Sequence, residues 1–137
     1  MSRYRRVSVI VVVALLLLAG VASSCGGLDV SSAAVLEELR VNFGTDVTAV
    51  EVGGSPGDVR IDVYTDYYPD SDMAAPARAM ASIAAQSGAV IDKHPSTTIT
   101  AYVWPKGKEF YVSRATATYQ DGRMTAPMDI YVNSVLE

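Results

Sequence analysis

Few residues of this 137-residue chain could support catalysis or metal binding. Cys25 is its only cysteine and His94 its only histidine. One thiol and one imidazole are too few soft ligands for a zinc or iron site. A Ser-His-Asp arrangement would need His94, and no serine stands in a nucleophile-elbow sequence. We therefore predict no catalytic residue, no metal and no cofactor.

Carboxylates are concentrated in the segment 66–72, which holds three aspartates. Carboxylate oxygens suit calcium, but the twelve-residue loop with a central glycine and a final glutamate is absent. Asp70, Ser71 and Asp72 stand directly before a predicted helix, where such side chains cap free N–H groups. The pattern therefore favours helix capping over a metal site. The alternative chemistry for the aspartates of this chain is acid and base catalysis of hydrolysis.

Aromatic side chains are predicted to gather on one face of a sheet. If the apolar residues of the two clearest strands face the helices, Tyr64, Tyr102 and Trp104 lie on the opposite face. Tyr67 and Tyr68 follow in the chain and are expected to fold over its rim. Together these five rings are our predicted ligand face. The alternative is that the rings only cover the sheet or pack under the C-terminal segment.

Two helices and four or five strands are expected to position these side chains. One helix is predicted from Ser31 or Ser32 to Phe43 and the other over 73–87, with Gly44 and Gly88 ending them. Strands are predicted over 47–52, 59–66, 97–104 and 110–119, with a possible fifth over 129–132. The order α-β-β-α-β-β predicts an α+β fold, with two helices packed on one face of an antiparallel sheet.

One turn stands out between the predicted strands near the C-terminus. Asp121 and Gly122 are a pair typical of two-residue hairpin turns. We therefore predict that the chain reverses direction there, directly after the strand 110–119.

The start of the chain has the three parts of an export signal. Residues 1–6 carry three arginines, 7–19 are apolar except for Ser8, and 20–24 are small or weakly polar. The apolar stretch 7–22 is shorter than the ~18–20 residues that a spanning helix normally needs. We therefore predict a signal peptide over 1–24, with a retained N-terminal transmembrane helix as the alternative.

The residues before the single cysteine are Val21, Ala22, Ser23 and Ser24. This stretch resembles the lipobox of bacterial lipoproteins, and the resemblance covers about residues 1–27. It implies that the Cys25 thiol is acylated, that the leader is removed, and that 25–30 is an acylated tether. Ala22 stands where leucine is most common in that family. Ordinary signal-peptidase cleavage, which would give a secreted protein, is therefore a further alternative.

The part of the chain beyond the tether, 31–137, is long enough for one small domain. From Cys25 onward, eight basic residues stand against 15 acidic ones, a net charge of −7. Such an acidic surface disfavours nucleic acid and anionic lipid headgroups. Membrane contact is therefore expected through the lipid on Cys25, on the extracytoplasmic side of the cell membrane.

The predicted function is that of a lipoprotein carrying a non-catalytic binding module. Its expected partner is an envelope protein or polysaccharide. Two alternatives of other classes are an envelope-polymer hydrolase that uses aspartates and a lipoprotein that excludes a phage or toxin.

Overall fold

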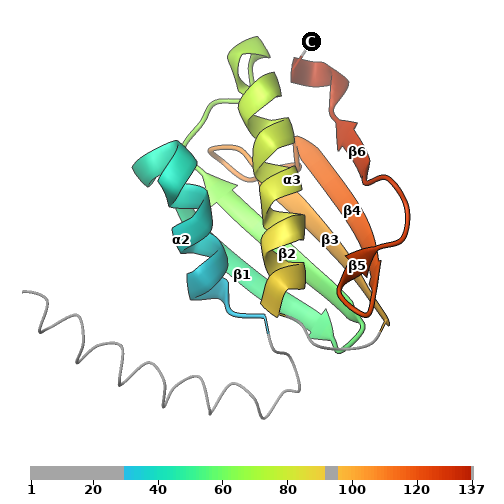
Figure 1. Ribbon diagram of the computed structural model, residues 1–137. Coiled ribbons are helices and arrows are strands. Elements are labelled where there is room, and N and C mark those ends of the chain that lie inside the picture. The colour runs from blue at the N-terminus through green and yellow to red at the C-terminus, as the bar shows by residue number, and fades with distance from the viewer. Residues whose placement is uncertain (1–29, 92–95, 137) are drawn as a thin grey trace, which may run out of the picture.

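The computed structural model describes residues 30–91 and 96–136 (Figure 1). The predictions made for 1–29, which include Cys25, and for His94 lie outside the described residues. The described chain has an α+β fold, in which two helices cover one face of a mostly antiparallel sheet of six strands.

The first helix, α2, spans Ser32–Phe43, as the sequence predicts. The Ser31 hydroxyl accepts a hydrogen bond from the Ala34 N–H at 3.2 Å and so caps the first turn. At the other end Gly44 adopts a φ of 61°, a conformation that glycine reaches without steric cost. The sequence therefore predicted both ends of this helix.

The second helix, α3, spans Ala74–Ile91 and follows a 3-10 turn at Ser71–Met73. The Asp70 carboxylate accepts a hydrogen bond from the Asp72 N–H at 3.0 Å, so Asp70 caps the turn that leads into the helix. The prediction that Gly88 ends the helix is wrong. Glycine inside a helix costs only about 1 kcal/mol relative to alanine, and α3 continues through it. No helix in the described part of the chain is long and apolar enough to cross a bilayer.

The sheet has more strands than predicted. They are β1 (Val47–Ser55), β2 (Asp58–Thr65), β3 (Ser96–Trp104), β4 (Ser113–Gln120), β5 (Arg123–Met124) and β6 (Asp129–Val132). The order is β1-β2-β3-β4, and both β5 and β6 pair with β4. The predicted hairpin joins β4 to β5, with positive φ at both Asp121 and Gly122. The expected number of four to five strands is too low because β5 has only two residues and was not recognised.

The strands β2 and β3 run parallel, which corrects the prediction of an entirely antiparallel sheet. The helix α3 lies between them in the sequence and carries the chain back along the sheet (Figure 1). Parallel neighbours need such a crossover, because a tight turn can only join antiparallel strands. The remaining pairs of strands are antiparallel.

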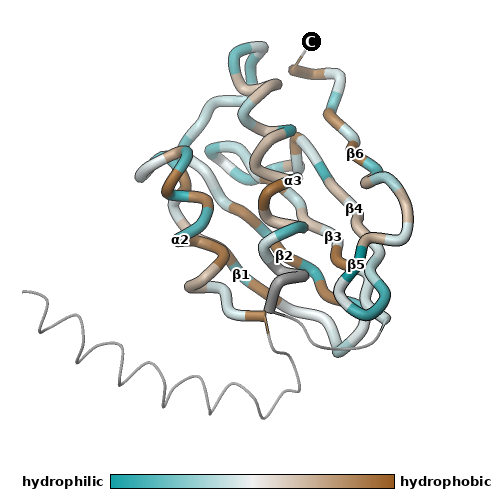
Figure 2. Tube along the Cα trace, viewed as in Figure 1, coloured by the Kyte–Doolittle hydropathy of each residue, from teal (hydrophilic) through white to brown (hydrophobic). Residues whose placement is uncertain are grey.

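The hydrophobic core lies between the helices and one face of the sheet. The alternating apolar residues of β2 and β3 are all buried: Val59, Ile61, Val63, Ile99, Ala101 and Val103. The helix α3 faces them with buried small side chains: Ala77, Ala81, Ala84 and Ala85. Hydrophobic segments accordingly occur on both helices and on the strands that they cover (Figure 2). The predicted alternation is confirmed, so the intervening side chains point away from the helices.

The strand β4 begins at Ser113, three residues later than predicted. The Val112 N–H donates to the Val103 carbonyl at 2.8 Å, and Ser113 is the register partner of Val103. Val112 and Ser113 are both buried, so two successive side chains enter the core opposite one residue of β3. As in a β-bulge, the alternation shifts by one position just before β4.

The outer edge of the sheet is partly covered where β1 begins. Arg40 of α2 donates from Nε to the Val47 carbonyl at 3.0 Å and from Nη2 to the Thr48 carbonyl at 3.5 Å. The Arg40 side chain thus covers the start of an edge strand, whose outward carbonyls have no neighbouring strand to pair with.

Gly54 is the glycine whose replacement we expect to damage the fold. It has a φ of 98°, and an added Cβ would collide with the Asp58 carbonyl oxygen. Gly54→Ala should therefore lower the free energy of unfolding by about 1–3 kcal/mol in urea titrations. Gly53→Ala is the matched control, because an added Cβ at Gly53 meets nothing within 4 Å. Equal stability of the two variants would contradict the prediction.

Candidate functional site

The sheet face opposite the helices carries a group of aromatic rings. Tyr64 extends from β2, Tyr102 and Trp104 from β3, and Tyr131 from β6. Tyr111 joins them from the connection between β3 and β4. In Figure 1 both helices lie on the other side of the sheet, so this face is free of described helices.

Four of these rings form a continuous series that we call the aromatic row: Tyr64, Trp104, Tyr111 and Tyr131. The rings of Tyr64 and Trp104 are nearly parallel, at 25°, with centroids 6.4 Å apart. Tyr111 meets Trp104 edge-on at 5.9 Å and Tyr131 edge-on at 6.0 Å. Tyr102 packs edge-on against Tyr111 at 4.9 Å. Such pairs contribute about 0.5–1.5 kcal/mol each beyond the area they bury, so the row is held in a defined arrangement.

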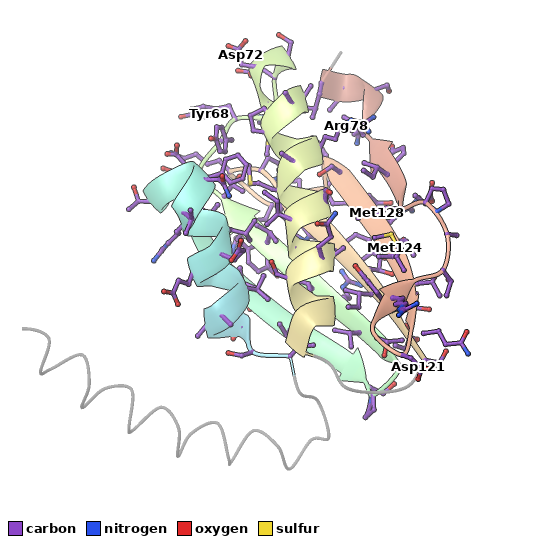
Figure 3. The ribbon with its side chains drawn as sticks, viewed as in Figure 1. Tyr68, Asp72, Arg78, Asp121, Met124 and Met128 are labelled. Carbon is purple, nitrogen blue, oxygen red and sulfur yellow. The ribbon has the colours of Figure 1, made fainter. Side chains whose placement is uncertain are left out.

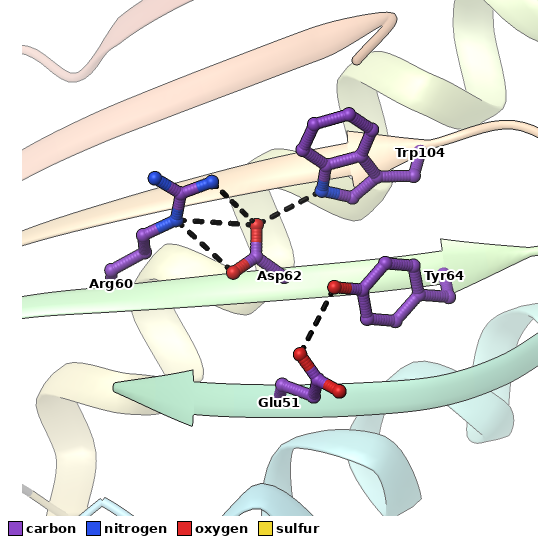
Figure 4. Close-up of polar contacts among 5 residues, drawn as sticks. All are labelled: Glu51, Arg60, Asp62, Tyr64 and Trp104. Atoms are coloured by element: carbon purple, nitrogen blue, oxygen red, sulfur yellow. Dashed lines mark hydrogen bonds and ion pairs between the residues drawn. The ribbon is translucent and has the colours of Figure 1, made fainter. Parts of the chain in front are cut away.

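The Asp62 carboxylate lies at the centre of the polar contacts on this face (Figure 4). It accepts a hydrogen bond from Trp104 Nε1 at 2.9 Å. Arg60 donates to both of its oxygens, with the closest contacts at 3.1 Å. The Asp62 side chain is only 15% exposed, whereas that of Arg60 is 51% exposed. Asp62 therefore holds both the indole and the guanidinium in position.

The hydrogen bonds of this face also shift proton equilibria. The bond to Asp62 raises the pKa of Arg60 above its ordinary value. Burial, followed by the hydrogen bond that its hydroxyl donates to Glu51 at 3.0 Å, raises the pKa of Tyr64. Both groups therefore keep their protons at neutral pH, with Arg60 charged and Tyr64 neutral.

Cations lie over the flat faces of several rings. Arg60 Cζ is 4.3 Å from the centroid of Tyr102, and Lys108 Nζ is 4.7 Å from that of Tyr64. At the opposite end of the row, Arg114 Cζ is 5.3 Å from the centroid of Tyr131. Basic side chains therefore border the row along its length, although the domain as a whole is acidic.

Three of the five predicted ligand-face residues lie together, and two do not. Tyr64, Tyr102 and Trp104 form part of the ring group. Tyr67 instead packs against the hydrophobic core, and burial followed by the nearby Asp46 raises its pKa. Tyr68 is 65% exposed and stands in the β2–α3 connection near the end of the molecule where α3 begins (Figure 3). Its described ring contact is with Lys106, not with the row.

Sequence reasoning missed Tyr111 and Tyr131. Counting alternate residues back from Ala115, which is buried, places Tyr111 on the core face. Because Val112 and Ser113 are both buried, the alternation shifts by one residue and Tyr111 points to the outer face. No turn motif in the sequence indicates this shift. Tyr131 lies in β6, which was expected only as a possible strand, and its register with Arg114 places it beside the other rings.

The carboxylates of this face serve as acceptors for neighbouring side chains. Glu51 and Asp62 are register partners on β1 and β2. Glu51 accepts from Tyr64, and Asp62 accepts from Arg60 and Trp104. In the described residues no three His, Cys, Asp or Glu side chains gather as a metal site requires. The arrangement therefore suits a surface that binds by stacking and hydrogen bonding.

Comparison with known proteins adds no relative from which a function could be transferred. No family model, no curated protein and no solved structure matches the chain.

Asp62 is expected to contribute more to the stability of this face than its neighbour Glu51 does. Asp62→Ala leaves the Trp104 N–H and the Arg60 guanidinium without their acceptor, and should cost about 1–2 kcal/mol of unfolding free energy. It should also shift the emission of Trp104, the only tryptophan. Glu51→Ala is the control, because water can replace its exposed bond to Tyr64, with an expected loss below about 0.5 kcal/mol. Urea unfolding followed by fluorescence measures both, and equal losses would contradict the prediction.

Proposed function

We propose that this chain is an extracytoplasmic lipoprotein, anchored in the cell membrane through Cys25, whose domain 31–137 is a non-catalytic binding module. The aromatic row is its proposed binding surface, and an envelope protein or polysaccharide is its proposed ligand. The observation that carries this proposal is the ordered group of rings on the uncovered sheet face.

The rings of this face are both accessible to solvent and held in defined positions. Tyr131 remains 40% exposed, and Trp104, Tyr102 and Tyr111 are only partly buried. Their positions are set by one another and by Asp62, so a ligand would meet a surface that is already ordered. Preorganisation of this kind lowers the entropy cost of binding.

The position of the row in the domain is consistent with a membrane anchor that precedes Val30 in the chain. The described chain starts at Val30, and α2 then runs for 12 residues, about 18 Å, away from that point. The strand that follows starts at Val47, whose register partner Thr65 adjoins Tyr64. The Tyr64 end of the row therefore lies near the end of α2 that is away from Val30.

The hydrolase alternative has less support from this face. The neighbouring carboxylates Glu51 and Asp62 are both engaged as hydrogen-bond acceptors, and Asp62 is paired with Arg60. A catalytic carboxylate must present an oxygen to the substrate, whereas these two carboxylates already accept hydrogen bonds from neighbouring side chains.

The anchor is tested by replacing the thiol. Cys25→Ala should abolish incorporation of an alkyne-bearing fatty acid and leave unprocessed precursor, because acylation requires the sulfur atom. Ser24→Ala is the control, since it keeps a small residue before the cysteine and should be labelled normally. A Cys25→Ala protein that is still labelled and processed would show that the lipid anchor is wrongly assigned.

The binding surface is tested by co-sedimentation of the full chain, in detergent, with insoluble envelope material. Trp104→Ala should weaken binding about tenfold or more, because central aromatic residues dominate many interfaces. Tyr68→Ala is the matched control, since Tyr68 is exposed but lies outside the row. If both variants sediment like the unmodified protein, the row is not the binding surface.

A further inference from the structure

We propose that the aromatic row binds a linear, carboxylate-bearing oligosaccharide that lies across the strands. This inference rests on the proposed function and names the class of ligand. It follows from the shape of the row, from the chemistry of the residues around it, and from the charges that border it.

The shape of the row fits an extended chain. Its rings come from β2, β3, the β3–β4 connection and β6, so the row crosses the sheet instead of following one strand. Successive centroids are separated by 6.4, 5.9 and 6.0 Å. In Figure 4 the rings of Tyr64 and Trp104 lie side by side. A single small ring would occupy only part of this surface, whereas a chain of several rings could contact all of it.

The chemistry of the row favours a saccharide over a protein partner. Of the large hydrophobic side chains exposed in the described residues, only Tyr131 belongs to the row. The other members are half-buried rings with polar groups beside them. A sugar ring has C–H groups that pack on an aromatic face and hydroxyls that bond to nearby polar groups. Thr100 and Thr116, paired across β3 and β4, point to the same side and add hydroxyls.

The charges that border the row indicate an anionic ligand. Arg60 is neutralised by Asp62, and Lys106 forms an ion pair with Asp66 at 3.5 Å. In the part of the chain that the structure describes, Lys108 and Arg114 have ring contacts but no ion pair, and Arg114 donates from Nη1 to the Tyr111 hydroxyl at 3.4 Å. They lie at opposite ends of the row, over Tyr64 and Tyr131. The carboxylates of Glu51 and Asp129 lie on the same face, but neither forms an ion pair with Lys108 or Arg114 in the described residues. The two cations, one at each end of the row, can therefore meet negative charges spaced along a chain.

The spacing of these cations favours singly charged groups, such as carboxylates, over dianionic phosphate groups. Sites that hold a dianionic phosphate typically gather several charged donors on one group. Lys108 and Arg114 instead stand apart, so each can meet one singly charged group. A uronic-acid chain presents such groups on successive sugar units and leaves its sugar faces free to stack.

The inference is tested by titrating the full chain in detergent micelles with tetragalacturonate. Trp104 is the only tryptophan and lies in the row, so its fluorescence reports on the site directly. Saturable binding is expected, and it should weaken as salt is raised because the charges are close to the surface. Tyr131→Ala should weaken binding about fivefold through loss of stacking. Lys108→Gln and Arg114→Gln should each weaken it about threefold.

Matched ligands and variants make the outcome decisive. Cellotetraose, which has no charge, should bind at least about tenfold more weakly. Tyr131→Phe and Arg114→Lys keep the ring and the charge, so both should bind nearly as well as the unmodified protein. Equal binding of the two oligosaccharides would overturn the assignment of an anionic ligand.

The test separates this inference from the proposed function. If tetragalacturonate does not bind while co-sedimentation with envelope material still depends on Trp104, the saccharide assignment is wrong and the binding module remains. If tetragalacturonate does not bind and Trp104→Ala leaves co-sedimentation with envelope material unchanged, the row is neither a saccharide site nor the binding surface.

Discussion

Burial of one side of β2 and β3 beneath α3 determines the character of both faces of the sheet. Each strand alternates strictly, so placing its valines and isoleucines against the alanines of α3 turns every intervening side chain outward. Slipping β2 by one residue would expose its apolar set and bury Arg60 and Asp62 in the core, at a high cost in free energy. The alternation that buries the apolar residues of β2 and β3 therefore also places Tyr64 and Trp104 of the aromatic row on the outer face.

The sequence predicted those features that depend on neighbouring residues. The start of the first helix at Ser31 or Ser32, its end at Gly44, the hairpin at Asp121 and the alternation of the central strands are all local, and all occur in the structure. The parallel pairing of β2 with β3 depends on where α3 returns the chain, which is a property of the whole fold. It could not be distinguished from two successive hairpins by local pattern alone.

In the candidate site, too, local pattern predicted some residues and long-range pairing determined the others. Tyr64, Tyr102 and Trp104 follow from alternation, whereas Tyr111 depends on the irregular step before β4 that puts Val112 and Ser113 side by side in the core. The contacts of Asp62 with Arg60 and Trp104 connect residues up to 42 positions apart, so no sequence motif contains them. Long-range register, which the sequence does not state, decides which polar residues hold the rings in place.

The side chain of Arg40 has a consequence for how this protein can associate. An open strand edge invites pairing with another chain, and β1 would offer one. The guanidinium occupies two carbonyls where β1 starts, and at the far side of the sheet the outermost strands have only two and four residues. Extension of the sheet from molecule to molecule is thereby discouraged at both borders. Under the proposed function, recognition would therefore fall to the flat side of the sheet, where side chains, not backbone groups, would select the ligand.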